Sequence, residues 1–208
     1  MIKTLHSTLR AFFSMLLLGV LIGLLHDRDT MVALLLLALV PFVAWRTYKR
    51  DPHPTKLTIL IAGALTTSLL GCMGEAWGIS HGYWVYHDLP GDRLFPLWLP
   101  LAWGGAFIAL YRFEYACIQS LNINTLPKKL LLAGIISATL PTWGEIVAIH
   151  LDVWHYTWSY QFFGVPLLAI MLLMLCHLGI YALFFLVCSR FDVRDRVFSM
   201  EPVVVTRK

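Results

Sequence analysis

The sequence predicts an all-α integral membrane protein, a bundle of six transmembrane helices that contains a duplicated helix pair. Of its 208 residues, 59% are hydrophobic and 13% are charged, and the mean hydropathy is +0.72. This composition lies outside the range of soluble globular domains. Six long apolar runs, and a match of the chain to itself at an offset of seventy residues, supply the rest of the prediction. Because the connections are short, we expect one transmembrane domain over residues 1–208.

The apolar runs set the expected helices. A bilayer core ~30 Å thick needs ~20 helical residues to cross it. The third, fifth and sixth runs are long enough alone, whereas the others need a few flanking polar residues. The first run follows Lys3 and Arg10, as in a signal peptide, but residues 25–28 offer no small-residue cleavage site. We therefore expect an uncleaved first helix. The runs cover residues 11–25, 31–45, 57–79, 96–111, 130–150 and 165–188.

The first two runs form an expected accessory pair within residues 1–45. A short turn at residues 26–29 joins them, and neither run contains an ionisable residue. Gly19 and Gly23 make a small-xxx-small pair of the kind that allows close helix contact. A polar loop over residues 46–56 separates this pair from the remaining helices. We expect these two helices to act as packing elements of the bundle.

The remaining four runs form two copies of one helix pair, over residues 57–111 and 127–181. A unit of two helices returns the chain to its starting side, so both copies enter the membrane in the same direction and the repeat is parallel. The second unit extends to residue 188, and we expect the charged tail over residues 189–208 to be disordered or to lie on inner headgroups. The residues that recur seventy positions later are Gly74, Glu75, Ile79, Trp84, Tyr86, Pro96, Leu97 and Tyr111.

The basic residues predict how the chain is oriented. Fourteen Lys and Arg residues lie on the side that holds both termini and the even-numbered loops, and only Arg28 and Arg93 lie on the other side. The positive-inside rule then places both termini in the cytoplasm of a multi-pass protein of the inner (plasma) membrane. There the basic residues meet anionic lipid headgroups. Nucleic acid is not an expected partner, since no basic and aromatic surface remains elsewhere.

Glu75 and Glu145 are the candidate catalytic pair. Each lies near the outer end of a predicted helix, and carboxylates within the membrane usually face a cavity and carry function. If the two copies pack about an axis normal to the membrane, the two carboxyls approach one another at one depth. Two like groups in one site share a proton more readily than they carry two charges. We therefore predict acid–base chemistry, with His81, His150 and Asp152 as secondary polar groups.

Aromatic side chains gather around the predicted outer ends of the repeated helices. Electron-rich ring faces stabilise cations, so a carboxylic acid that protonates an alkene would find its carbocation enclosed by indoles. The same tryptophans would also suit an interfacial belt, and His177 would also suit a packing role. The substrate-binding candidates are Trp77, Trp84, Tyr86, Trp103, Trp143, Trp154, Tyr156 and His177.

Two segments carry a resemblance to a known family. The stretch GEAWGISHGYWVYHD at residues 74–88, followed by FPLWLPLAW at 95–103, resembles the first signature of the bacterial and archaeal carotenoid-biosynthesis membrane proteins, which include the carotenoid 1,2-hydratases. The stretch VWHYTWSYQFFGVPLL at 153–168 is similar to the second signature. The resemblance covers about half of the chain, and extends more distantly to membrane lycopene and terpene cyclases. It implies a carotenoid or other isoprenoid substrate and hydration or cyclisation, although the first copy has LFPL in place of GVPL.

Three other interpretations stay open on the sequence. The chain could be a proton-coupled carrier or lipid-binding membrane protein, in which the repeats enclose a substrate path. It could be a metal-dependent lipid hydrolase that uses the outer histidines, which are His81, His87, His150 and His155. These lack HxxxH or HExxH spacing, and we predict no metal. The two glutamates could also only hold the bundle together. No phosphate loop or dinucleotide fingerprint is present, so no organic cofactor is expected, and the sequence does not predict an oligomeric state.

Overall fold

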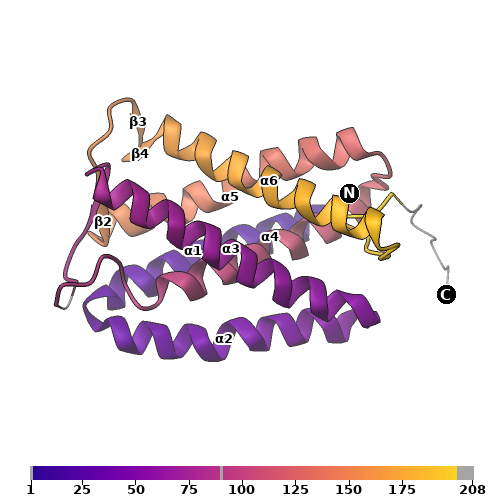
Figure 1. Cartoon of the computed structure of the whole chain (residues 1–208), viewed down its shortest axis with the longest axis horizontal. Helices are drawn as coiled ribbons and strands as arrows, with labels where there is room; N and C mark the ends of the chain where they lie inside the picture. Colours follow the sequence, from indigo (N-terminus) through magenta and orange to yellow (C-terminus); the bar gives the residue numbers. More distant parts are fainter. Residues whose placement is uncertain (1, 90, 201–208) are drawn as a thin grey trace.

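The chain forms a helical bundle capped at one end by short strands (Figure 1). The computed structural model describes residues 2–89 and 91–200, and between residues 2 and 15 only the side chains of Leu9 and Phe13. The helices run along the long axis, and α1 begins at the same end as α6 finishes. The helices are α1 (Ile2–Leu25), a 3-10 turn η1 (His26–Arg28), α2 (Asp29–Arg50), α3 (Pro54–Ser80), α4 (Leu99–Leu121), α5 (Leu126–His150) and α6 (Leu167–Arg190); the strands are β1 (Trp84–Tyr86), β2 (Trp154–Tyr156), β3 (Gln161–Phe162) and β4 (Val165–Pro166).

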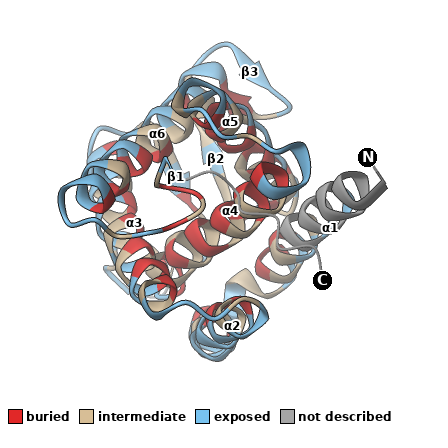
Figure 2. Cartoon of the chain, turned by 90° about the vertical axis from the view of Figure 1, so that its right-hand side faces the viewer, coloured by how far each residue is buried: buried red, intermediate tan, exposed pale blue. Residues whose placement is uncertain are grey.

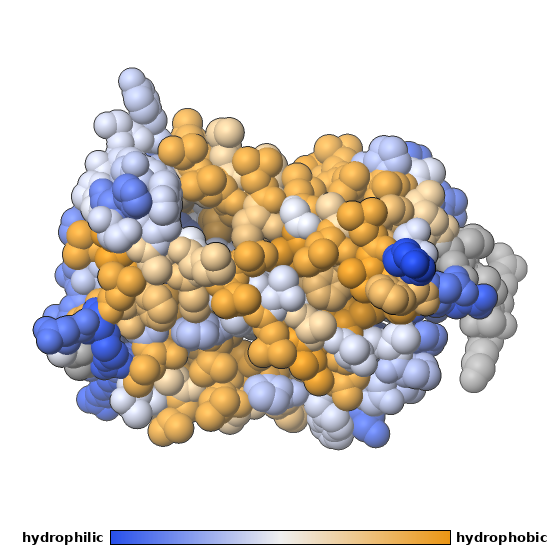
Figure 3. Space-filling view, viewed as in Figure 1, coloured by the Kyte–Doolittle hydropathy of each residue, from blue (hydrophilic) through white to orange (hydrophobic). Residues whose placement is uncertain are grey.

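Four helical stretches are long and apolar enough to cross a membrane, judged by length and composition. The first contains all of α2 together with η1 and the C-terminal part of α1, and the other three correspond to α3, α5 and α6. Apolar side chains form a broad band across the middle of the molecule, and hydrophilic side chains gather at its two ends (Figure 3). This distribution is typical of a membrane protein. The stretches are Leu16–Arg50, Pro54–Ser80, Leu126–His150 and Leu167–Arg190.

Helix α4 differs from the sequence prediction at both ends. It begins at Leu99 rather than at Pro96, so Pro100 lies in its first turn and does not kink it. Proline suits this position because the first amides of a helix have no partner within it. At the other end, α4 continues beyond the predicted end at Tyr111 and includes Glu114, which is 1% exposed. The prediction stopped too early because the charged residues after Tyr111 look like a loop.

The most extensive helix contacts are those of α3 with α4, of α1 with α5 and of α5 with α6. Helix α1 packs against α5 and α4, and α2 packs against α4. In the end-on view, α1 and α2 lie at the periphery of the group formed by α3 to α6 (Figure 2). The predicted close contact of α1 is confirmed, since Gly19 faces the backbone of Gly144 and Gly23 faces the side chain of Leu151.

The segment after α6 folds back into the bundle. Phe198 is 1% exposed and packs between the rings of Phe107, Tyr181 and Phe184. The Tyr111 hydroxyl donates to Asp195 Oδ2 at 2.7 Å. The expectation of a disordered or headgroup-bound tail is therefore wrong for residues 191–200, because that stretch contains apolar side chains that complete the core. Residues 201–208 of the predicted tail lie outside the described residues.

The antiparallel strands β1 and β2 join the connection of α3 and α4 to that of α5 and α6. Trp84 pairs with Tyr156, and Tyr86 pairs with Trp154. Aromatic and β-branched residues favour this extended conformation. Two further backbone bonds flank the strands: His87 N donates to Val153 O, and Thr157 N donates to Tyr83 O, each at 2.9 Å. If every residue is replaced by its counterpart seventy positions away, each of these pairings becomes the other. A local twofold axis produces this relation.

Candidate functional site

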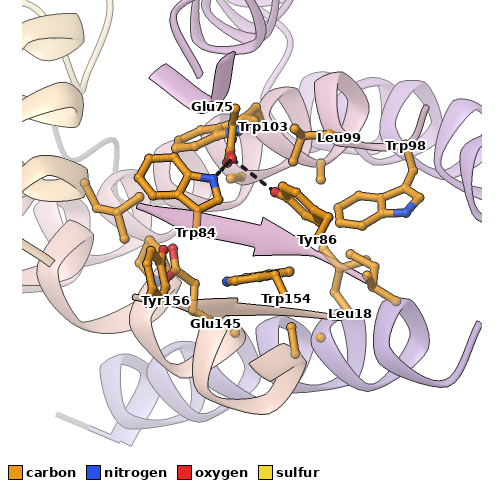
Figure 4. A pocket seen from close by; sticks show the side chains of 18 residues that line it. Leu18, Glu75, Trp84, Tyr86, Trp98, Leu99, Trp103, Glu145, Trp154 and Tyr156 are labelled. Atoms are coloured by element: carbon orange, nitrogen blue, oxygen red, sulfur yellow. Dashed lines mark hydrogen bonds between the residues drawn. The ribbon is translucent and has the colours of Figure 1, made fainter. Parts of the chain in front are cut away.

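A cavity of about 140 Å³ lies beneath the strand pair and contains both candidate glutamates. The strands bring aromatic rings over the space, and helices from both halves of the chain form its walls (Figure 4). Helix α1 also contributes, through Leu18, Gly19 and Ile22. The predicted accessory helix therefore forms part of the cavity wall. The other residues around it are Glu75, Trp84, Tyr86, Trp98, Leu99, Ala102, Trp103, Ala106, Pro141, Gly144, Glu145, Ala148, Trp154, Tyr156 and Leu173.

Three side chains donate hydrogen bonds to Glu75. Trp84 Nε1 lies 2.8 Å and the Tyr86 hydroxyl 3.2 Å from Oε2, and Trp103 Nε1 lies 3.3 Å from Oε1. Figure 4 shows the first two of these bonds. Two of the donors come from β1 and the third from α4. The carboxyl group is thus held in a fixed position by aromatic donors.

Two glycines of α3 make room for the indoles that hold Glu75. A Cβ atom at Gly78 would lie 1.8 Å from the Trp84 ring, and one at Gly71 would lie 2.3 Å from the Trp103 ring. These glycines come four residues before and three residues after Glu75, which places all three on one face of the helix. Glycine therefore makes space for the indoles around Glu75 at these two positions. Gly74 has no atom within 4 Å of such a Cβ.

Glu145 has a different set of partners from Glu75. The Tyr156 hydroxyl donates to its Oε2 at 2.8 Å, which is its only hydrogen bond from the described residues. Burial raises the pKa of Tyr86 and of Tyr156 well above that of an ordinary tyrosine, and the neighbouring glutamates raise it further. Both hydroxyls therefore stay protonated and act as donors.

The structure brings together some of the predicted site residues. Glu75 and Glu145 share the cavity with five of the substrate-binding candidates. These five are Trp84, Tyr86, Trp103, Trp154 and Tyr156. Their roles in binding or catalysis remain predictions, but their positions around one space meet the geometric requirement for those roles.

Other candidates lie away from the cavity. Trp77 is 48% and Trp143 40% exposed. Trp77 follows Glu75 by two residues, and Trp143 precedes Glu145 by two residues. Side chains two positions apart on a helix point in directions that differ by about 200° around its axis. His81 and His150 bond instead to backbone carbonyls four residues earlier, at 2.7 Å each. Asp152 is exposed on the outer surface, where its Oδ1 lies 2.8 Å from His87 Nδ1.

His177 lies in a second buried polar site that the sequence reasoning missed. Its Nε2 is 2.6 Å from Oε1 of Glu114, and both side chains are buried between α4 and α6. Glu114 Oε2 has no hydrogen-bond partner among the described residues. Because the sequence prediction ended the fourth helix at Tyr111, it left Glu114 in a loop and did not select it as a carboxylate of a membrane helix. Glu114 and His177 are each surrounded by apolar residues in the sequence, and this was the available signal.

Within residues 2–89 and 91–200, no group of three or more His, Cys, Asp and Glu side chains has the arrangement of a metal site. Two of the outer histidines instead form a pair, with His87 Nε2 and His155 Nδ1 2.6 Å apart. Comparison of this chain with protein families, with curated proteins and with solved structures finds no match.

Proposed function

We propose that the protein is a membrane enzyme that protonates an alkene of a carotenoid or other polyisoprenoid, using a glutamic acid in the cavity. Capture of the resulting cation by water gives an alcohol, and capture by a second alkene gives a ring. The observation that carries this proposal is the shared cavity, in which two carboxyl groups meet a wall of indole and phenol rings. The resemblance of residues 74–103 and 153–168 to carotenoid-biosynthesis membrane proteins agrees with it.

The chemistry of the cavity wall suits a cationic intermediate. A general acid in an apolar site donates a proton effectively, and the faces of Trp and Tyr rings attract positive charge. The cavity volume of about 140 Å³ is close to that of an engineered apolar cavity of ~150 Å³ that binds benzene. A space of this size accepts one end group of an isoprenoid chain, with the remainder lying outside it.

The proposal includes a six-helix membrane topology with a parallel duplicated helix pair at residues 57–111 and 127–181. Reciprocal hydrogen bonds around β1 and β2 support the duplication, because replacing each partner by its counterpart seventy positions away turns one bond into the other. Helix α4 contains Arg112 and Glu114 and is not among the four stretches that are apolar enough to span, but Glu114 is paired with His177 within the bundle. The basic residues favour cytoplasmic termini in the inner membrane, where they meet anionic headgroups.

Glutamine substitution tests the acid. We expect Glu75→Gln and Glu145→Gln each to lower conversion of an acyclic carotenoid by about 10²–10⁴-fold, the range that general acid–base catalysis supplies. The assay uses purified protein in liposomes, with product identified by mass spectrometry. Asp92→Asn is the matched control, since it neutralises an exposed carboxyl outside the cavity. Full turnover in both glutamine variants would remove the basis of the proposal.

The same preparation separates the two other candidate functions. A proton-coupled carrier would accumulate or release the isoprenoid across the liposome membrane without forming product, and both glutamine variants would change this flux. A metal-dependent lipid hydrolase would release a water-soluble fragment and would lose activity with a chelator. Product formation that is unaffected by the chelator supports alkene protonation.

A further inference from the structure

The local twofold relation of the two copies is broken around the glutamates by three sequence differences. Gly71 of α3 corresponds to Pro141 of α5, Gly78 corresponds to Ala148, and Trp103 of α4 corresponds to Leu173 of α6. The two glycines are the positions against which Trp103 and Trp84 pack. The second copy therefore lacks the space that the two glycines provide. It also lacks a counterpart of the Trp103 indole.

Ala148 accounts for the different position of the second strand tryptophan. Trp84 lies so close to Gly78 that a methyl group there would overlap its ring. Trp154 is the counterpart of Trp84, and Ala148 puts a methyl group at the corresponding place. Trp154 lines the cavity but donates no hydrogen bond to Glu145 in the described part of the chain. Glu145 is consequently left with Tyr156 alone.

The number of donors decides the protonation state that each carboxyl favours. Hydrogen bonds to a carboxylate stabilise its ionised form, and burial in apolar surroundings favours the neutral form. Glu75 receives three such bonds, whereas Glu145 receives one and has Oε1 unpartnered by the described residues. Among the residues around the cavity, the titratable groups are the two glutamates, Tyr86 and Tyr156; α1, α4 and α6 add none. One proton shared by the glutamates therefore lies on Glu145.

We propose that the two glutamates have fixed and different roles: Glu145 is the proton donor and Glu75 is the proton acceptor. This assignment rests on the proposed function. The alkene π electrons form a C–H bond with the Glu145 proton, leaving a Glu145 carboxylate and a tertiary carbocation. In hydration, a water oxygen forms the C–O bond and its proton passes to the Glu75 carboxylate; in cyclisation, Glu75 takes the proton lost from the ring cation. Transfer of that proton from Glu75 to Glu145 restores the starting state.

Infrared spectroscopy of the purified full-length protein in detergent tests the assignment without substrate. The carbonyl stretch of a protonated carboxyl is separate from the bands of a carboxylate. We expect Glu145→Gln to remove one protonated-carboxyl band, and Glu75→Gln to leave that band in place and remove carboxylate absorption. Tyr156→Phe, which keeps both carboxyls, shifts the protonated band to higher frequency, whereas Tyr86→Phe does not. Loss of the protonated band in Glu75→Gln, or its absence from the wild type, overturns the assignment.

Deuterium labelling extends the test to the reaction. In liposomes prepared in D₂O with an acyclic carotenoid, Glu75→Gln keeps its acid, so recovered substrate gains deuterium at the terminal alkene while product is lost. Glu145→Gln gives neither label nor product. Labelling in Glu145→Gln but not in Glu75→Gln contradicts the assignment. If the infrared bands follow the expectation and wild-type protein labels no alkene, the protonation assignment stands and the proposed isoprenoid chemistry fails.

Discussion

At the scale of single residues, two glycines decide which glutamate is enclosed by indole donors. Gly71 and Gly78 let Trp103 and Trp84 approach the α3 backbone, and both indoles then reach Glu75. A helix normally disfavours glycine by about 1 kcal/mol relative to alanine. Here the absence of side chains at the two glycines creates the space in which the indoles position a carboxyl group. The helix stability lost at these glycines thus accompanies a gain in the geometry of the site.

An alanine scan of these glycines tests this interpretation. We expect Gly78→Ala to displace Trp84, weaken the bond from its Nε1 to Glu75 and lower the free energy of unfolding by about 1–3 kcal/mol, the usual cost of overpacking. Gly74→Ala is the matched control on the same helix, because its methyl group would meet open space. Tryptophan near-ultraviolet circular dichroism reports the displacement, and unfolding in mixed detergent reports stability. Equal behaviour of the two variants would contradict the proposed packing role.

The sequence predicted the central pair of the candidate site but assigned too many aromatic residues to its surroundings. Glu75 and Glu145 could be selected because ionisable groups within apolar helices are rare, and the aromatic residues of β1 and β2 followed from the repeat. Trp77 and Trp143 were included by proximity along the chain, which ignores that residues two apart point to different sides of a helix. The number of hydrogen bonds that each of the two carboxyls receives depends on tertiary packing and could not be predicted from the sequence.

At the scale of elements, the apolar runs predicted where most helices lie, but not how their ends are completed. The strands β1 and β2 are too short for a period-two pattern to distinguish them from a loop. The inner part of α4 was missed because its charges are satisfied by distant partners, with Glu114 bonded to His177 of α6. The segment over residues 191–200 was missed for the same reason, since Asp195 is held by Tyr111 and by backbone amides of its own turn.

Truncation of one aromatic ring tests whether the segment after α6 is part of the core. We expect Phe198→Ala to lower the free energy of unfolding by about 3–5 kcal/mol, as for other fully buried phenylalanines. Phe191→Ala is the control from the same segment, because Phe191 is 70% exposed, and we expect a change within about 0.5 kcal/mol. Unfolding followed by circular dichroism in mixed detergent measures both. A small effect at Phe198 would mean that the segment does not stabilise the bundle.

At the scale of the whole molecule, polar groups divide between the two ends of an apolar bundle. The strand pair and its histidines lie at one end, and the basic loops together with residues 191–200 lie at the other. Asp51 at the basic end accepts a hydrogen bond from the Tyr115 hydroxyl and lies near Lys56, and these contacts lower the pKa of its carboxyl. This arrangement gives the molecule distinct ends, which is a prerequisite for one orientation in a membrane.

Cysteine labelling in intact cells measures that orientation. In a cysteine-free background, we expect Asp92→Cys, in the connection before α4, to react with a membrane-impermeant maleimide. Asn122→Cys, in the connection between α4 and α5, should react only after the membrane is permeabilised, because the basic loops are expected in the cytoplasm. The reverse pattern would invert the proposed topology, and reaction of both without permeabilisation would exclude a span by α4.

The size of the cavity has a consequence for which molecules the proposed enzyme would distinguish. A space of about 140 Å³ would contact one terminus of a polyene and would not sense the length of the rest of the chain. Selectivity would then depend on the branching of the last isoprene unit, and chains of different carbon number would compete equally. A molecule with two identical termini would be converted in two independent encounters, with the singly modified compound accumulating between them.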